Sequence, residues 1–169
     1  MGYTSPEPLE RRHAIDDFDC GEPPLDDWLK RHARPAQGAG SARTYVTTID
    51  TTEVVGYYAL AAAQVEPDEA TSRLLKGEPQ QRAVPAVLLA RLAVDRRHQS
   101  QGVGRSLLQD AVLKCLQAAD SVGVRAMLIH AKHEQARAWY EQYGFERSPS
   151  DPLHLMLLVK DLRAFVDRA

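Results

Sequence analysis

The segment of residues 86–131 constrains the fold of this chain most. It opens on a nearly continuous apolar run, residues 86–94, which is typical of a central strand covered on both faces. From Gly102 the apolar residues recur at helical spacing and mark one face of a long helix that ends near Gly123. Residues 126–131 are predicted to form a second buried strand. We expect these two strands to lie parallel in one sheet and to be linked by a right-handed crossover.

Mixed helix and strand patterns surround this crossover. In the amino-terminal half, Pro23-Pro24 predicts the start of a helix, and the residues from Arg34 to Gly40 predict a loosely structured segment after it. Residues 44–49 and 54–58 are predicted to form an antiparallel hairpin. A short helix within 66–77 and a loop over 77–81 are predicted to follow. The carboxyl-terminal patterns predict a helix over 134–143 stopped by Gly144, a strand over 153–159 and a terminal helix. We therefore expect a mixed α/β fold in a single domain, residues 1–169, with a central sheet flanked by helices.

Composition and residue usage restrict the cellular location and the metal sites that we expect for this chain. With 44% hydrophobic and 26% charged residues, its apolar runs are interrupted before membrane-spanning length. The first residues contain no basic segment followed by an apolar stretch, so we expect no secretory signal, no membrane association and a cytoplasmic location. Cys20 and Cys115 form no metal-binding pair, and Cys115 falls on the apolar helix face, where a core role is expected. His130 and His133 are too few to indicate a metal site, so none is expected.

The charges are unevenly distributed along the chain. Residues 1–27 carry eight acidic side chains against two arginines, whereas residues 28–49 carry four lysine or arginine side chains and no acid. A second basic stretch spans residues 82–105, where Asp95 is the one acid. Such stretches can form a surface for a polyanion such as a nucleic acid, or they can be solvated faces of ordinary elements.

The turn between Val94 and Gly102 is the best candidate site. Glycines at 102 and 104 let backbone amides approach a ligand closely, and the amino-terminal N–H groups of the following helix point to the same place. Such a turn is typical of phosphate binding, and Arg105 and Ser106 could add to it. It lacks the third glycine of a dinucleotide fingerprint and the Gly-Lys-Ser/Thr ending of a nucleotide triphosphate loop. A tight turn that only needs small residues is the alternative.

Two motifs resemble a known superfamily. Leu92-Ala93-Val94 followed by Gln99-x-x-Gly102-x-Gly104 resembles the acetyl-CoA signature of the GNAT N-acetyltransferases, and Tyr140-x-x-x-Gly144-Phe145 resembles their second hallmark, a tyrosine-bearing helix closed by Gly-Phe. Phe18-Asp19-Cys20-Gly21, Leu25-Asp26-Asp27-Trp28-Leu29 and Arg91-Leu92-Ala93-Val94-Asp95 are similar to the TacT-like toxins of bacterial toxin–antitoxin systems. The resemblance covers nearly the whole chain and implies the GNAT fold.

The resemblance implies an acetyl-CoA-dependent enzyme that acetylates the free α-amine of an aminoacyl-tRNA and so blocks translation. It implies that Tyr140 is the general acid that protonates the departing CoA sulfur. The cofactor contacts that it implies are Leu92, Ala93, Val94, Gln99, Ser100, Gln101, Gly102, Val103, Gly104, Arg105, Ser106, Ala131, His133 and Ala136. His133 departs from the family, which often has asparagine there. Together with the basic stretches, the resemblance favours tRNA phosphate contacts at Lys30, Arg31, Arg34, Arg43, Arg91 and Arg97.

No carboxylate or histidine stands out as a general base, although Glu66 could act through a water molecule. An α-amine has a pKa of about 8, against about 10.4 for lysine, so an aminoacyl acceptor needs less help from a base. Acetylation of a small-molecule amine, an antibiotic or a protein amine is the alternative within the enzyme class. A module that keeps CoA as a ligand, or that only binds a regulator, is the non-enzymatic alternative. The resemblance also implies a ribbon-helix-helix antitoxin as partner and a homodimer.

Overall fold

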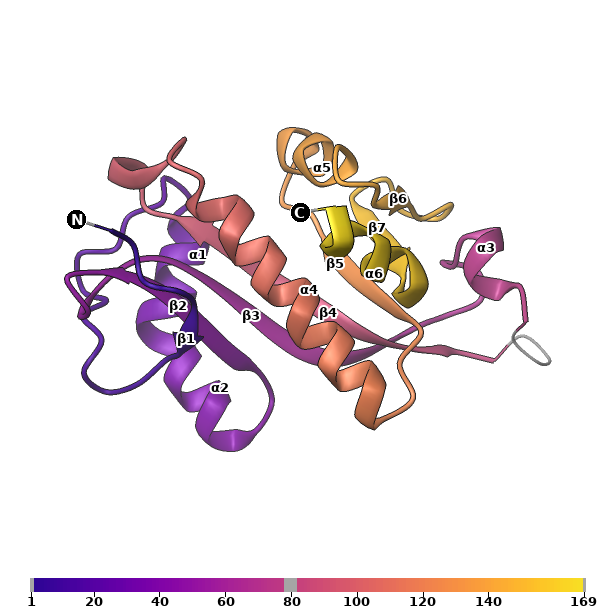
Figure 1. The fold of residues 1–169 in the computed structure, drawn as a ribbon, viewed down its shortest axis with the longest axis horizontal. Helices are drawn as coiled ribbons and strands as arrows, with labels where there is room; N and C mark the ends of the chain where they lie inside the picture. The colour runs from indigo at the N-terminus through magenta and orange to yellow at the C-terminus, as the bar shows by residue number, and fades with distance from the viewer. Residues whose placement is uncertain (1, 78–81, 169) are drawn as a thin grey trace. The chain divides into compact units, whose positions relative to one another are not determined.

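The computed structural model describes residues 2–77 and 82–168, so most of the predicted loop over 77–81 lies outside the described residues. The chain divides into two compact units, and Figure 1 labels their helices and strands. Unit 1 comprises residues 1–61 and 90–111, and unit 2 comprises residues 62–89 and 112–169. Three elements run through both units: β3 (Glu53–Val65), β4 (Val84–Val94) and α4 (Val103–Ser121). The expectation of a single domain stays a prediction.

Unit 1 contains four strands in the order β1-β2-β3-β4, where β1 is Glu7–Pro8 and β2 is Arg43–Ile49. Strands β2 and β3 are antiparallel, with Tyr45 opposite Tyr58, so the predicted hairpin is confirmed. Strand β3 continues past the predicted end to Val65. The two-residue strand β1, which pairs with β2, has no apolar alternation and was not predicted.

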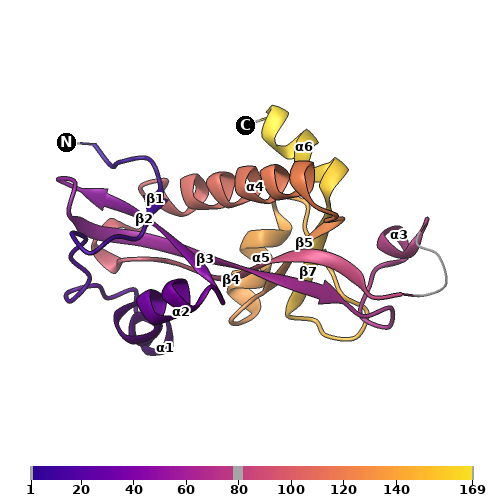
Figure 2. The same cartoon turned by 90° about the horizontal axis from the view of Figure 1, so that it is seen from below.

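The amino-terminal helix of unit 1 is longer than predicted. It runs through α1 (Pro23–Asp27), a π-helical turn η1 (Trp28–His32) and α2 (Ala33–Ala39). The prediction that the chain loosens from Arg34 is wrong, because Pro35 falls in the first turn of α2, where its missing N–H and fixed φ are tolerated. The helix ends at Gly40, which has a φ of 80°. Figure 2 shows α1 and α2 on the face of these strands opposite to the start of α4.

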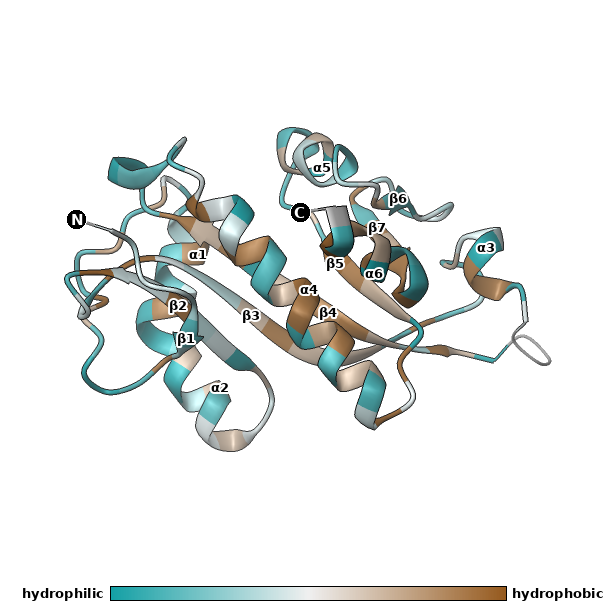
Figure 3. Cartoon of the chain, in the orientation of Figure 1, coloured by the Kyte–Doolittle hydropathy of each residue, from teal (hydrophilic) through white to brown (hydrophobic). Residues whose placement is uncertain are grey.

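The core of unit 1 joins the amino-terminal segment to the strands. Phe18, Leu29 and Tyr57 are fully or almost fully buried in one cluster, and Trp28 packs against it. Apolar and polar residues alternate along α4 (Figure 3), and its apolar face is buried from Val103 to Leu116, as predicted. Cys115, on the part of α4 that belongs to unit 2, is fully buried, which confirms its predicted place in the core.

Unit 2 contains strands in the order β3-β4-β5-β7-β6. Strands β4 and β5 are parallel, with Ala86 opposite Ala126, which confirms the predicted parallel pair. The predicted short helix is reduced to α3, because Thr71 caps it and the acidic segment before it forms turns. The two-residue strand β6 was not predicted. The other bounds are β5 (Ala126–His130), β6 (Glu146–Arg147), β7 (His154–Leu158), α3 (Ser72–Leu75), α5 (Glu134–Glu141) and α6 (Val159–Arg168).

Leu74, Leu128 and Met156 belong to the hydrophobic core of unit 2. Gly144, with a φ of 99°, follows the last turn of α5, as the sequence predicted. Across residues 2–77 and 82–168, every helix is too short or too polar to span a membrane.

Candidate functional site

The turn after β4 in unit 1 is anchored by Asp95. This side chain is buried and accepts hydrogen bonds from the backbone N–H groups of Asp19 (3.1 Å) and Arg97 (2.9 Å). The Arg97 guanidinium bonds both carboxylate oxygens at 3.0 and 3.1 Å. Burial alone would raise the pKa of Asp95, but these bonds lower it to about 2. The ionised carboxylate therefore fixes the end of β4 to the amino-terminal segment.

Gln99 stabilises the same turn through hydrogen bonds of its side-chain amide. The amide nitrogen donates to the carbonyl oxygens of Val94 (2.9 Å) and Cys20 (3.2 Å). Arg96 bonds both carboxylate oxygens of Asp19 at 3.0 and 2.8 Å. The glutamine of the predicted cofactor signature thus holds the shape of the turn in this structure, and the segment around Asp19 supports it.

Two residues with a left-handed backbone conformation connect the turn to α4. Ser100 has a φ of 63° and Gly102 a φ of 85°. The N–H of Ser106 already bonds the carbonyl of Gly102 at 3.1 Å, whereas the N–H groups that precede it in a first helical turn have no acceptor within the helix. With the helix dipole, this end of α4 favours an anion.

A hollow of about 260 Å³ lies beside the start of α4 in unit 1. Its lining is rich in hydroxyl groups and includes no carboxylate: Tyr3, Thr4, Ser5, Thr47, Gln101, Gly102, Val103 and Ser106. The donor groups and the absence of negative charge from this lining suit a phosphate group.

We predict that Gly102→Ala lowers both the free energy of unfolding and the affinity for acetyl-CoA. A Cβ at this position would meet no atom within 4 Å, so the cost is the left-handed backbone alone, about 1–2 kcal/mol. Chemical denaturation and titration calorimetry with acetyl-CoA would measure the two effects. Gly123→Ala is the matched control, since its Cβ also has open space and its φ lies outside the left-handed region. Equal behaviour of the two variants would contradict the prediction.

Three of the six residues predicted to contact tRNA form ion pairs or hydrogen bonds within unit 1. The Arg31 guanidinium lies 2.9 Å from the Asp27 carboxylate. Arg34 donates to the backbone carbonyls of Glu10 and His13, and Arg97 is held by Asp95 as described above. Lys30 and Arg43 are exposed, and within the described ranges neither forms an ion pair.

Arg91 differs from the other predicted contacts. Its guanidinium carbon lies 4.4 Å from the ring centroid of Trp28, which in turn stacks on Tyr57 at 6.0 Å and an interplanar angle of 10°. The Tyr57 hydroxyl donates to the carbonyl of Leu25 at 2.7 Å, so the stack is fixed to α1. Partial burial lowers the pKa of Arg91, and no ion pair to it is found among the described residues. The stack on Trp28 therefore holds the Arg91 guanidinium in one position.

Tyr140 lies on α5 in unit 2 and is buried. The rings of Trp139 and Phe145 contact it edge to face, with centroids 5.0 and 6.3 Å away. Burial raises the pKa of Tyr140, so the phenol is protonated at neutral pH. The side chain of His133 caps α5, because its Nδ1 accepts the N–H of Ala136 at 3.1 Å.

The predicted site residues divide between the two units. Leu92–Val94, the turn to Ser106 and all six basic residues belong to unit 1, whereas Ala131, His133, Ala136 and Tyr140 belong to unit 2. The N–H of the buried Ala131 donates to the carbonyl of Leu153 at 2.8 Å.

Sequence reasoning missed a histidine pair in unit 2. His130 and His154 are opposite each other in the β5–β7 register, and their rings stack at 3.9 Å. His154 also lies 3.4 Å from the Asp151 carboxylate and 3.9 Å from that of Glu69. Only the strand register brings the two imidazoles together, so the sequence spacing gave no signal.

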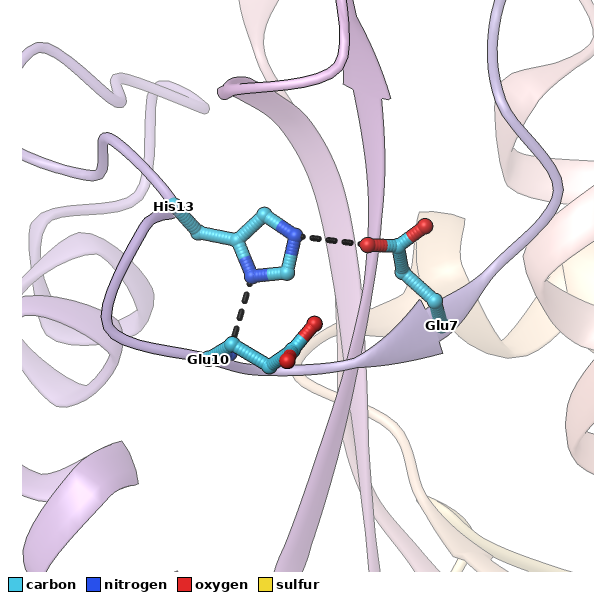
Figure 4. A group of neighbouring side chains, drawn as sticks. All are labelled: Glu7, Glu10 and His13. Atoms are coloured by element: carbon cyan, nitrogen blue, oxygen red, sulfur yellow. Dashed lines mark hydrogen bonds and ion pairs between the residues drawn. The ribbon is translucent and has the colours of Figure 1, made fainter.

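A second group with metal-ligand chemistry lies at the amino terminus, where Glu7, Glu10 and His13 approach within 4.8 Å (Figure 4). The N–H of Glu10 donates to His13 Nδ1 at 2.8 Å, so the ring proton lies on Nε2, which donates to Glu7 at 2.9 Å. Arg12 bonds both carboxylates. Both ring nitrogens and the carboxylates thus have partners within the chain. The group therefore stabilises the loop after β1.

Comparison with known proteins agrees with these observations. The family described as an acetyltransferase (GNAT) domain matches residues 40–147. A tRNA-acetylating toxin of Mycobacterium tuberculosis is 47% identical over 165 residues, which cover 98% of each chain. A probable toxin TacT of Sinorhizobium fredii is 29% identical and covers 95% of this chain and 93% of its own.

Solved structures are similar over almost the whole chain. AtaT complexed with acetyl-methionyl-tRNAfMet has a TM-score of 0.87 at 27% identity, covering 96% of this chain and 98% of that one. A tyrosine-to-phenylalanine mutant of AtaT, bound to the C-terminus of the antitoxin AtaR and to acetyl-CoA, has a TM-score of 0.80 at 26% identity and covers 96% of each chain.

Proposed function

The chain belongs to the GNAT family of acetyltransferases, and from this premise we propose that it acetylates the free α-amine of an aminoacyl-tRNA and thereby blocks translation. The similarity to a tRNA-acetylating toxin over 98% of both chains carries the proposal. The half-buried cation of Arg91, which forms no ion pair with any residue that the structure describes, supports it independently, because a tRNA acceptor brings phosphate groups to the enzyme.

The residues at the start of α4 fit the cofactor. Acetyl-CoA supplies an acetyl group activated as a thioester. The turn from Gln99 to Ser106 would hold its pyrophosphate, because the helix end and the hydroxyl-lined hollow offer donors without negative charge. The backbone of Leu92–Val94 would run beside the pantetheine arm, and Ala131, His133 and Ala136 complete the proposed contacts.

Tyr140 would act as the general acid. As the acceptor amine attacks the carbonyl carbon, the carbon–sulfur bond breaks and the departing sulfur needs a proton. The raised pKa of the buried phenol keeps that proton available over the whole neutral range. The ring packing against Trp139 and Phe145 would hold the hydroxyl in one orientation.

An antitoxin partner belongs to the same proposal, since a structurally similar toxin is described with the C-terminus of its antitoxin. We propose a ribbon-helix-helix antitoxin and a homodimeric toxin for this chain. A charged tRNA as substrate places the reaction in the cytoplasm.

The test is to incubate the purified protein with acetyl-CoA and a mixture of charged tRNAs, and to identify aminoacyl-adenosines by mass spectrometry after nuclease digestion. We expect acetylated aminoacyl-adenosine, and none when the tRNA has been deacylated beforehand. Acetyl transfer to small amines or protein amines alone, with charged tRNA unmodified, would overturn the proposal and favour the alternative acceptors.

A further inference from the structure

Thr47 of strand β2 lines the hollow beside the start of α4 in unit 1. In the β2–β3 register it lies opposite Gly56. A Cβ at Gly56 would lie 2.9 Å from side-chain atoms of both Val103 and Leu107, so this face of β3 packs directly against α4. Because opposite residues of an antiparallel pair share one face of the sheet, the side chain of Thr47 also points toward α4 and the hollow.

The hydroxyl of Thr47 is buried, and within the described part of the chain it has no hydrogen-bond partner. Two other hydroxyl groups of the lining already have partners. The Tyr3 hydroxyl pairs with Nδ1 of His98 at 3.0 Å, and the Thr4 hydroxyl pairs with that of Thr48 at 3.0 Å. A buried hydroxyl without a partner costs free energy and is rare in folded proteins. Thr47 therefore indicates a polar group that binds in the hollow from outside the chain.

The surroundings of this hydroxyl favour an anion. The residues of the lining carry hydroxyl and amide groups and no carboxylate. The first N–H groups of a helix have no acceptor within it, and the helix dipole adds partial positive charge at the same end of α4. The volume of about 260 Å³ is smaller than the roughly 300–1,000 Å³ of sites that hold a whole small ligand. The hollow thus suits one group of a larger ligand, such as a phosphate.

We propose that Thr47 is a binding residue for a phosphate group of acetyl-CoA, and that its hydroxyl donates a hydrogen bond to a phosphoryl oxygen. This inference rests on the proposed function. The hollow shares Gln101, Gly102, Val103 and Ser106 with the turn proposed to hold the cofactor. Strand β2 then supplies a contact to the phosphate that the glycine turn alone does not.

Thr47→Val tests this role, because it removes the hydroxyl and keeps the shape of the side chain. We expect the affinity for acetyl-CoA to fall by about tenfold, the lower end of the range for a hydrogen bond to a charged group. The midpoint of urea unfolding should stay the same or rise, since the variant no longer buries an unpaired hydroxyl. Titration calorimetry and urea denaturation of the whole chain measure the two quantities. Thr47→Ser, which keeps a hydroxyl, should recover most of the affinity.

Thr44→Val is the matched control. Thr44 lies on the same strand and is fully buried, and its hydroxyl also has no hydrogen-bond partner among the residues that the structure describes. An odd number of positions separates it from Thr47, so its side chain points to the other face of the sheet, on which α1 and α2 lie (Figure 2). We expect Thr44→Val to bind acetyl-CoA as the wild type does.

Equal affinities of Thr47→Val and Thr44→Val for acetyl-CoA would overturn the inference and leave the proposed function intact. The same holds if filter binding shows that Thr47→Val weakens the binding of tRNA while the affinity for acetyl-CoA is unchanged, because the phosphate would then belong to the tRNA. Failure of the wild type to bind acetyl-CoA would instead overturn the proposed function.

Discussion

Tyr140→Phe is expected to slow acetyl transfer by about 100- to 10,000-fold, the range in which general acid catalysis contributes, while acetyl-CoA binds with unchanged affinity. The substitution removes one oxygen and keeps the ring that packs against Trp139 and Phe145. The fold should therefore persist, and the loss should fall on the chemical step. Because burial raises the pKa of Tyr140, the phenol stays neutral through pH 6 to 9 and adds no inflection to the pH profile there.

Single-turnover measurements with charged tRNA and titration calorimetry with acetyl-CoA would separate the two effects of Tyr140→Phe. Tyr143→Phe is the matched control, because Tyr143 follows the same helix and stacks on Phe165 at 5.7 Å. We expect near-normal transfer from the control. Near-normal turnover of Tyr140→Phe, or an equal loss in both variants, would remove Tyr140 from the proposed mechanism.

The long-range pattern of the sequence predicted the central part of the fold. The apolar run of residues 86–94 forms β4, and the helical spacing after Gly102 forms α4 with its apolar face buried. Both signals are strong because each element buries many side chains on a regular period. The hairpin of β2 and β3 was predicted for the same reason.

Short or interrupted elements could not be predicted. Strands β1 and β6 have two residues each, too few for any period to appear. Pro35 indicated a loose segment, yet the π-helical turn before it lets the helix continue to Ala39. In these places tertiary packing and local hydrogen bonding decide the conformation, and the sequence shows neither.

The candidate site shows a similar division. The glycine turn after β4 was identified correctly as a helix entry, but its sequence does not show that the Gln99 amide bonds Val94 and Cys20. A count of basic residues does not reveal which of them are already neutralised. Strand register, which the sequence does not display, creates the stack of His130 on His154.

Arg91→Ala is expected to weaken binding of charged tRNA by about 10- to 100-fold, as the loss of a charge-assisted bond of roughly 1.5–3 kcal/mol implies. The guanidinium is already partly desolvated and stacked over Trp28, so little further cost opposes its contact with a phosphate. Binding should fall steeply with added salt, and the variant should reduce the slope of log K against log salt by about one. Filter binding at several salt concentrations would measure both.

Arg31→Ala is the matched control for Arg91→Ala. The Arg31 side chain is exposed and paired with Asp27 at 2.9 Å, so the contact with a phosphate would have to compete with that carboxylate and with water. We expect its removal to change tRNA affinity by no more than about fivefold, as exposed ion pairs are worth less than about 1 kcal/mol. Arg91→Lys should recover little, because an ammonium does not reproduce the planar stack on Trp28. Equal losses from Arg31→Ala and Arg91→Ala would mean that net charge, and not the geometry of Arg91, determines tRNA binding.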